Sequence, residues 1–95
     1  MGNEYFKAQY RPLLPECNQI IYNDIKSLEK ISKKTSAVII ESIQGASGFI
    51  VASNEFLVEL NKVCKKYEVL IIFDEIQTCF GRTGTLFGFE QTNII

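Results

Sequence analysis

An unbroken apolar run, Val69 to Phe73, ends abruptly in two carboxylates, Asp74 and Glu75. A strand with one solvent-facing side alternates polar and apolar residues, so this run predicts a strand buried on both faces. Such strands are typical of parallel sheets, whose ligands bind just beyond the carboxyl ends of the strands. Asp74 is therefore either a site residue or simply the first residue of a loop.

A second apolar run, Ala37 to Ile40, also ends in an acid, Glu41. Between the runs, Ser53 or Asn54 can cap a helix whose apolar residues recur at helical spacing. Strand, helix and strand form a βαβ unit with parallel strands, which places Glu41 and Asp74 at the same sheet edge. The predicted fold class is α/β. A small, flexible loop is expected over 42–48 and a turn-rich loop over 79–84. Residues 44–48 and the loop over 74–84 can then face one site. The apolar face of the predicted helix comprises Phe56, Leu57, Leu60, Val63, Cys64 and Tyr67.

The first third of the chain predicts smaller elements. A short helix is expected over residues 3–10 and a short edge strand over 19–22. Asn23 or Asp24 is a suitable N-cap for the next helix. That helix is expected to turn three apolar side chains inward: Ile25, Leu28 and Ile31.

Composition excludes several classes of function. A chain of 95 residues is one domain at most, and a formal net charge of −1 provides no basic field for nucleic acid or a membrane surface. No apolar run is long enough to span a membrane, and the polar start is not a signal peptide. The chain has no histidine, so Ser-His and Cys-His nucleophiles are excluded and a zinc site is not expected. The unpaired pattern of Cys17, Cys64 and Cys79 indicates free thiols, and hence a cytoplasmic location.

Two kinds of chemistry fit an apolar strand that ends in Asp-Glu. One is the magnesium-binding strand of a P-loop ATPase, but the Gly-x-x-x-x-Gly-Lys-Ser/Thr loop that cradles phosphates is missing from the sequence. In the other, Asp74 faces the nitrogen of a heteroaromatic cofactor and the Gln77 amide donates to an oxygen on the same ring. A carboxylate keeps a pyridine nitrogen protonated, so that the ring can withdraw electrons from a substrate carbanion.

Two motifs resemble a known family. Ile72-Phe73-Asp74-Glu75-Ile76-Gln77-Thr78, followed by Gly81-Arg82-Thr83-Gly84, is similar to the signature of class III pyridoxal phosphate aminotransferases. Glu41-Ser42-Ile43-Gln44-Gly45 resembles the family's Glu-Pro-Ile-Gln-Gly loop, and the acetylornithine/ornithine aminotransferase branch is the most similar. The resemblance implies that residues 1–95 are a single incomplete domain, the βαβ portion of the parallel-sheet large domain of a fold-type I pyridoxal phosphate enzyme.

The resemblance also implies roles for individual residues. Asp74 would pair with the pyridinium nitrogen, Gln77 would bond the phenolic oxygen, and Ile76 would pack on the ring face. The substrate side would be lined by Gln44, Gly45 and Glu41. The alternative for Glu41 is a strand-end carboxylate bonded to nearby backbone.

Three positions depart from the family pattern. Ser42 stands where the family usually has proline, Ala46 where the ornithine-type branch has an acid, and Cys79 where the loop has glycine. Without the acid at Ala46 the amino donor stays open. If the backbone at Cys79 needs a positive φ, the side chain there costs strain. Arg82 would lie near the active site and the subunit contact.

The family's glycine-rich phosphate segment and its Schiff-base lysine have no counterpart in this chain. Three hypotheses follow. The first is a segment of a longer, homodimeric enzyme that moves an amino group from an ornithine-like or other ω-amino donor to a 2-oxo acid, with the isolated chain inactive. The others are a non-catalytic remnant, whose strands lack neighbours and leave apolar faces open, and an ATPase-like strand.

Overall fold

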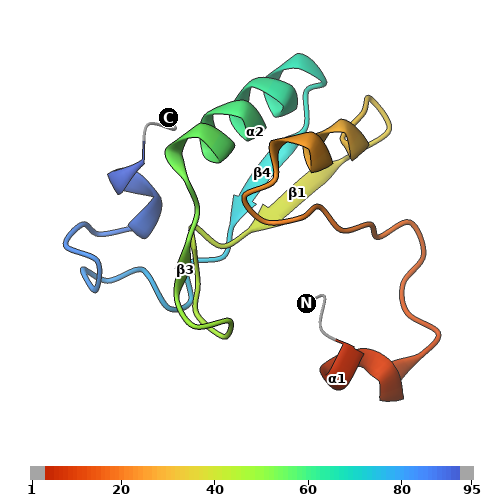
Figure 1. Cartoon of the computed structure of the whole chain (residues 1–95), viewed down its shortest axis with the longest axis horizontal. Helices are drawn as coiled ribbons and strands as arrows, with labels where there is room; N and C mark the ends of the chain where they lie inside the picture. Colours follow the sequence, from red (N-terminus) through yellow and green to blue (C-terminus); the bar gives the residue numbers. More distant parts are fainter. Residues whose placement is uncertain (1–3, 93–95) are drawn as a thin grey trace.

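A parallel βαβ unit forms the centre of the computed structural model, which describes residues 4–92. Strand β1 (Ala37–Ile40) pairs in parallel with β4 (Leu70–Phe73), with Ala37 opposite Leu70 and Ile40 opposite Phe73. Helix α2 (Asn54–Lys66) makes the crossover between them (Figure 1). The backbone N–H of Asp74 donates to the Ile40 carbonyl at 2.8 Å, which extends the ladder by one residue. The predicted α/β unit and its parallel strands are confirmed.

Helix α2 begins and ends where its sequence indicates. The Ser53 side chain accepts a hydrogen bond from the Phe56 N–H, so Ser53 is the N-cap. Glu55 in the first turn and two lysines in the last turn complement the helix dipole. The predicted apolar face packs onto the sheet, and four of its side chains are almost fully buried: Phe56, Leu57, Leu60 and Cys64.

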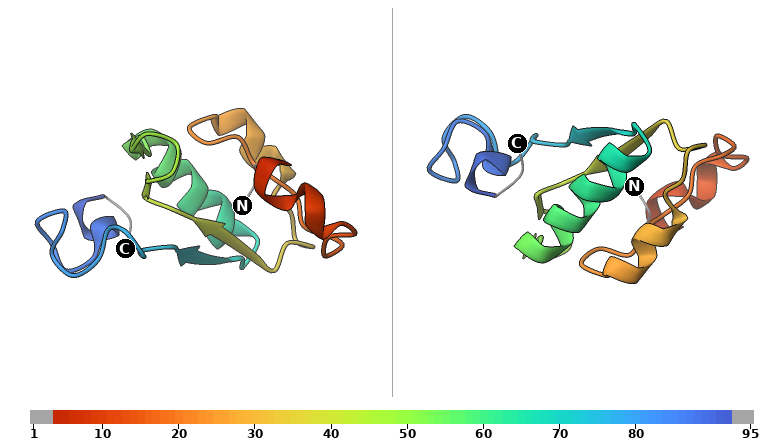
Figure 2. Two further views of the ribbon diagram at one scale, coloured as in Figure 1. Left: turned by 90° about the horizontal axis from the view of Figure 1, so that it is seen from below. Right: turned by 90° about the horizontal axis from the view of Figure 1, so that it is seen from above.

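The sheet is covered on one face only. Figure 2 shows α2 and the 3-10 helix η2 (Ile25–Lys30) on the same side of the two strands. Val38 and Ile40 point into this layer and are buried. On the opposite face Ile39, Leu70 and Ile72 are 51%, 69% and 47% exposed. The prediction of strands buried on both faces is therefore wrong for this chain, because no helix among residues 4–92 covers the second face.

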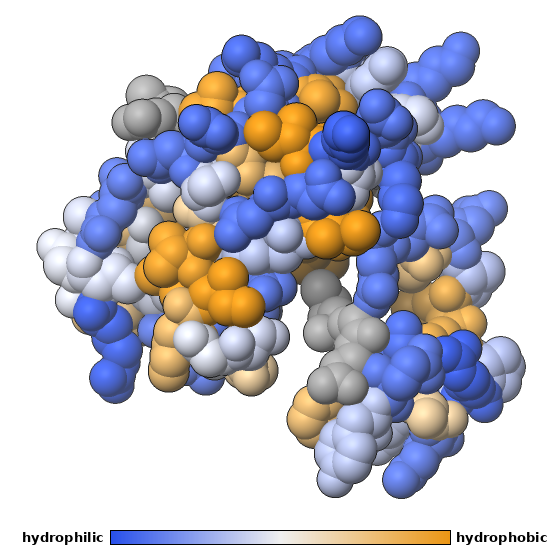
Figure 3. Space-filling model, in the orientation of Figure 1, coloured by the Kyte–Doolittle hydropathy of each residue, from blue (hydrophilic) through white to orange (hydrophobic). Residues whose placement is uncertain are grey.

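The segment predicted as a flexible loop contains a small hairpin. Strand β2 (Ile43–Gln44) pairs antiparallel with β3 (Ile50–Val51), and the Ala52 N–H donates to the Ser42 carbonyl at 3.0 Å. Gly48 and Phe49 take positive φ values of 90° and 58°, which turn the chain back on itself. The hairpin leaves apolar side chains on the surface (Figure 3), and the exposed ones are Phe49, Ile50 and Val51.

The predicted N-terminal helix is present as helix α1 (Glu4–Lys7) followed by the 3-10 helix η1 (Ala8–Tyr10). Position 3 of the predicted helix lies outside the described residues. These turns lie apart from the βαβ unit, joined to it by an extended segment (Figure 1).

The predicted edge strand over 19–22 is wrong. The Ile21 N–H and carbonyl both bond the Ser27 hydroxyl, at 2.9 and 3.0 Å, and the carbonyl also accepts from the Asp24 N–H. The polar groups that would pair in a sheet are thus used locally, in a turn that leads into η2. Asp24 is the N-cap of η2, since its side chain accepts from the Lys26 N–H.

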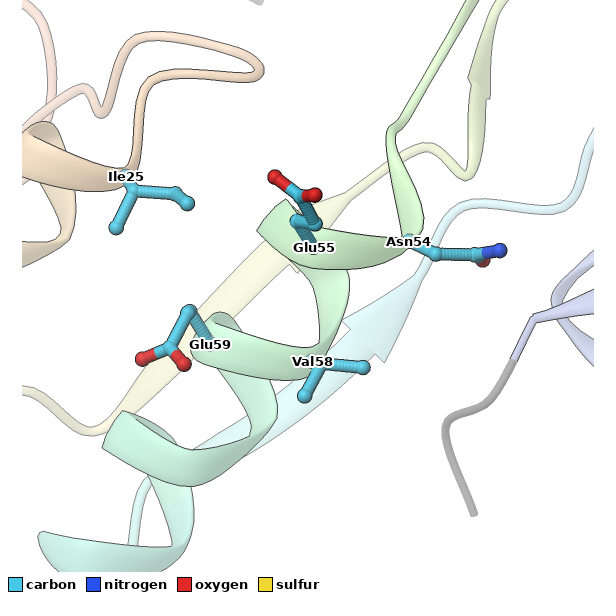
Figure 4. A pocket seen from close by; sticks show the side chains of 5 residues that line it. All are labelled: Ile25, Asn54, Glu55, Val58 and Glu59. Atoms are coloured by element: carbon cyan, nitrogen blue, oxygen red, sulfur yellow. The ribbon is translucent and has the colours of Figure 1, made fainter.

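Two of the three apolar side chains predicted for this helix turn inward, Leu28 within η2 and Ile31 at its C-cap. Leu28 and Ile31 are buried, whereas Ile25 is 43% exposed, so that part of the prediction is wrong. Ile25 faces the start of α2, where polar side chains meet it in place of core residues (Figure 4). The shallow depression between the two helices is lined by Ile25, Asn54, Glu55, Val58 and Glu59.

Candidate functional site

Asp74 lies at the carboxyl end of β4, half-buried at the sheet edge. Its Oδ1 accepts a hydrogen bond from the Ile76 N–H at 3.1 Å, which bends the chain into a turn directly after the strand. Among the described residues no donor bonds Oδ2. The turn leaves Ile76 84% exposed and Gln77 exposed beside it. An acceptor, an apolar side chain and an amide are therefore accessible within four consecutive residues.

The loop after β1 touches this segment. A Cβ placed on Gly45 would lie 3.3 Å from Cδ of Gln77, so the Gln77 side chain packs directly against the Gly45 backbone. A larger residue at Gly45 would push the amide away. The two loops that the parallel topology predicted to face one site are in contact through these residues.

Glu41 organises the same loop. Its Oε2 accepts a hydrogen bond from the Gly45 N–H at 3.1 Å, which joins the residue after β1 to the residue after β2. This is the geometry of the alternative interpretation, a strand-end carboxylate bonded to nearby backbone. A role of Glu41, Gln44 or Gly45 toward substrate stays a prediction.

Glu75 has a role that the sequence did not indicate. Its carboxylate accepts hydrogen bonds from the backbone N–H groups of Gly88 and Phe89, each at 2.9 Å, and from the Thr78 hydroxyl. Gly88 and Phe89 open the 3-10 helix η3 (Gly88–Gln91), and the Phe89 ring stacks on Phe73 at 5.3 Å between centroids. Glu75 thus ties the far end of the 79–87 loop back to the site. A carboxylate after a buried strand is a signal for some role, but no local pattern pairs it with a residue thirteen positions later.

Tyr22 and Ser42 lie behind the loop. The Tyr22 hydroxyl donates a shared hydrogen bond to the carbonyls of Glu41 and Ser42, at 2.9 and 3.0 Å. Burial raises the pKa of Tyr22 to about 12, and the charge of Glu41 adds to the shift. The Ser42 side chain is buried and its hydroxyl has no hydrogen-bond partner among the described residues. Proline, which the family usually has there, would bring no such hydroxyl.

The loop after the site is turn-rich, as predicted. Its left-handed positions fall on Phe80 (φ 58°), Gly81 (φ 78°) and Gly84 (φ 98°), not on Cys79. The condition for strain at Cys79 is therefore not met. Arg82 is exposed in the same loop.

The remaining features of the described part concern metals, membranes and thiols. Within residues 4–92 no cluster of three or more His, Cys, Asp or Glu side chains could hold a metal ion. None of the helices there is long and apolar enough to cross a bilayer. Cys17, Cys64 and Cys79 are free, and burial raises the pKa of the Cys64 thiol.

Comparison with known proteins identifies the family of the chain. The sequence model described as Aminotransferase class-III matches residues 3–95. The chain belongs to the class III aminotransferase family. An acetylornithine aminotransferase from Bacillus cereus is 44% identical over 94 residues, which cover 98% of this chain and 24% of the relative. A [LysW]-aminoadipate semialdehyde/glutamate semialdehyde transaminase from Sulfolobus acidocaldarius is 42% identical over 93 residues, with the same coverage.

Solved structures of the family have the same fold. The ornithine aminotransferase from Toxoplasma gondii superimposes with a TM-score of 0.87 at 29% identity, over 98% of this chain and 23% of that one. The ornithine aminotransferase from Plasmodium yoelii gives 0.71 at 42% identity, over 78% of this chain and 20% of that one. The chain thus spans about a quarter of the length of these class III aminotransferases. The resemblance drawn from the two motifs is confirmed, and the ATPase alternative is not favoured.

Proposed function

We propose that this chain is the part of a class III aminotransferase that holds the ring of pyridoxal phosphate. The observation that carries the proposal is the placement of Asp74, Ile76 and Gln77 in one turn beyond a parallel strand, with Gln77 packed on Gly45. The parent enzyme moves an amino group from an ornithine-like or other ω-amino donor to a 2-oxo acid. It is a homodimer in the cytoplasm. The names of the relatives support an ornithine-type donor.

The residues present fit the cofactor. A pyridinium N–H needs an anionic acceptor, and Oδ2 of Asp74 has none of its bonding capacity used by the described residues. The ring face needs an apolar surface, and Ile76 offers an exposed one. A phenolic oxygen needs a donor, which the exposed Gln77 amide supplies. When bound, the cofactor provides an electron-withdrawing ring that stabilises negative charge at the substrate carbon.

Each protein group has a defined task. Asp74 holds a proton at the ring nitrogen, since a carboxylate within a few ångströms favours the charged form of a base. The bond from the Ile76 N–H to Oδ1 fixes the orientation of that carboxylate. Gln77 orients the ring through its phenolic oxygen and is itself held by Gly45. Gln44, Gly45 and Glu41 line the side on which substrate enters.

We also propose that the isolated chain is inactive. Lysine can hold the cofactor covalently only where it is desolvated beside the ring. Lys7 is half-buried in α1 and lies 3.5 Å from Glu4, away from the βαβ unit. The other lysines are all exposed: Lys26, Lys30, Lys33, Lys34, Lys62, Lys65 and Lys66.

A chimera tests the proposal. Residues 2–95 replace the matched segment of the Bacillus cereus acetylornithine aminotransferase, and the visible absorption of bound pyridoxal phosphate is recorded together with transamination of N-acetylornithine and ornithine. We expect a coloured, active enzyme, and a comparison of the two donors assigns the substrate. A chimera that folds as a dimer yet retains no cofactor would refute the proposal in favour of a non-catalytic remnant.

Matched variants locate the effect. Asp74→Asn in the chimera is expected to lower kcat about 100-fold or more, because it removes a charge that stabilises the reacting ring. Gln77→Ala should weaken cofactor retention with a smaller loss of rate. Glu90→Gln is the control, since Glu90 is an exposed acid of the same region that has no hydrogen bond to the site.

A further inference from the structure

Two side chains of the turn that precedes η2 form hydrogen bonds with both ends of the β2–β3 hairpin. At the first end, the Tyr22 hydroxyl donates to the carbonyls of Glu41 and Ser42, where β1 leads into the hairpin. At the second end, Asn23 Nδ2 donates to the Val51 carbonyl at 3.0 Å, and Asn23 Oδ1 accepts from the Ser53 N–H at 2.8 Å. Two adjacent side chains thus bind backbone on either side of a segment about ten residues long.

Tyr22 and Asn23 are themselves held in place. The Tyr22 ring packs on Phe56, 5.9 Å between centroids, and Phe56 is fully buried in the core. Asn23 has a φ of 63°, a left-handed conformation that asparagine accepts more readily than most residues. That conformation aims its side chain at the hairpin while Tyr22 points into the core. Tyr22 and Asn23 therefore fix the hairpin relative to the core.

The hairpin needs such support. It consists of two two-residue strands, and its outer side chains Phe49, Ile50 and Val51 are exposed. A two-stranded hairpin of this size is marginal without tertiary contacts. Its own closing bond is that from the Ala52 N–H to the Ser42 carbonyl. The bonds from Tyr22 and Asn23 flank this closing bond on both sides.

We propose that Tyr22 and Asn23 are positioning residues that hold the Gln44–Gly45 turn against Gln77. Their value for catalysis rests on the proposed function, because Gln77 is there the donor to the cofactor ring. The positional effect itself exists in the chain without cofactor. Tyr22 and Asn23 touch no reacting atom and act through the hairpin alone.

Backbone hydrogen exchange of the full 95-residue chain, without cofactor, tests the proposal. Tyr22→Phe keeps the ring on Phe56 and removes only the hydroxyl. Each lost hydrogen bond of this kind lowers local stability enough to speed exchange about 5-fold. We expect that acceleration at Gly45 and Ala52, with Leu70 and Asp74 in the β1–β4 ladder unchanged. The nuclear Overhauser contact between Gly45 Hα and the Gln77 side chain should weaken in parallel.

Substitutions at Asn23 provide the second arm and the rescue. Asn23→Gly permits the positive φ and removes both bonds, whereas Asn23→Asp keeps the acceptor for the Ser53 N–H. Exchange at Ser53 should rise in Asn23→Gly and return toward the original rate in Asn23→Asp. Tyr10→Phe, which removes an exposed hydroxyl elsewhere, should change nothing.

Two results would overturn the proposal. One is unchanged exchange in the hairpin of both Tyr22→Phe and Asn23→Gly. The other is equal acceleration in the hairpin and in the β1–β4 ladder, which would show a general loss of stability. Should Tyr22→Phe fail to fold, the Asn23 pair at the exposed end decides. Failure of the chimera to bind pyridoxal phosphate would refute the proposed function and leave this test untouched.

Discussion

Removal of the Glu75 carboxylate should release the loop that follows the site while the βαβ unit stays folded. In Glu75→Ala the backbone N–H groups of Gly88 and Phe89 lose their acceptor, and so does the Thr78 hydroxyl. Hydrogen bonds to a charged group contribute about 1.5–3 kcal/mol each. Taking the lower value for the two backbone bonds gives about 3 kcal/mol, since the site is only half-buried and water can replace part of the loss.

That free energy acts locally. About 3 kcal/mol corresponds to a roughly 100-fold rise in the population of the opened loop. Hydrogen exchange at Gly88 and Phe89 measures this opening directly, and limited proteolysis in the 79–87 loop should accelerate with it. Glu75→Gln keeps one acceptor oxygen of the same shape and should show a smaller effect.

Glu90→Gln removes a charge from the same 3-10 helix without touching these bonds, and should leave exchange at Gly88 unchanged. Gly88→Ala should reproduce the release, because a Cβ there would lie 2.8 Å from Cβ of Thr78. Unchanged protection of Gly88 and Phe89 in Glu75→Ala would refute the assigned role.

Three further substitutions follow from single contacts. Ser42→Ala should leave the free energy of unfolding unchanged or raise it by about 1 kcal/mol, because the buried Ser42 hydroxyl has no partner among the described residues. Ser27→Ala should lower the free energy of unfolding, because the Ser27 hydroxyl bonds the turn before η2. Urea unfolding distinguishes the two signs, and a destabilised Ser42→Ala would contradict the prediction. The pKa of Tyr22 is about 12 in the folded chain and about 10 in the unfolded chain, so folding is favoured by the protonated hydroxyl below pH 10 and this stability is lost between pH 10 and 12. The difference in unfolding free energy between Tyr22→Phe and the unmodified chain should therefore shrink over that window, and parallel profiles would refute the prediction. Ser53→Ala should cost about 1 kcal/mol by thermal unfolding through loss of the α2 cap, with the exposed Asn54→Ala as a smaller control, and equal losses would argue against the cap.

The elements that the sequence predicted are those with local causes. The apolar run before Asp74, the cap at Ser53 and the helical spacing of the α2 face each lie within a few residues of what they determine. Parallel pairing then followed from the helical crossover between the two strands, and with it the meeting of the Gly45 and Gln77 segments. The sequence thus predicted which two loops meet and at which edge of the sheet they lie.

The failures have longer-range causes. The stretch around Ile21 has strand-like composition, but the Ser27 hydroxyl claims its backbone groups. Burial of both sheet faces depends on covering layers, and the described residues supply only one. The roles of Glu75 and Tyr22 join positions thirteen and about twenty residues apart, and periodicity has no information on such pairs. The features that the sequence did not predict are mainly hydrogen bonds between residues far apart in the chain.

The role of Asp74 is tested most directly by the protonation state of the cofactor nitrogen. Pyridoxal phosphate labelled with 15N in the ring is bound to the chimera, and its nitrogen resonance is compared with that in Asp74→Asn. We predict a protonated pyridinium in the unmodified chimera across neutral pH, and an unprotonated nitrogen in Asp74→Asn. The same protonation state in both proteins would contradict the assignment of Asp74 as the group that keeps the ring charged.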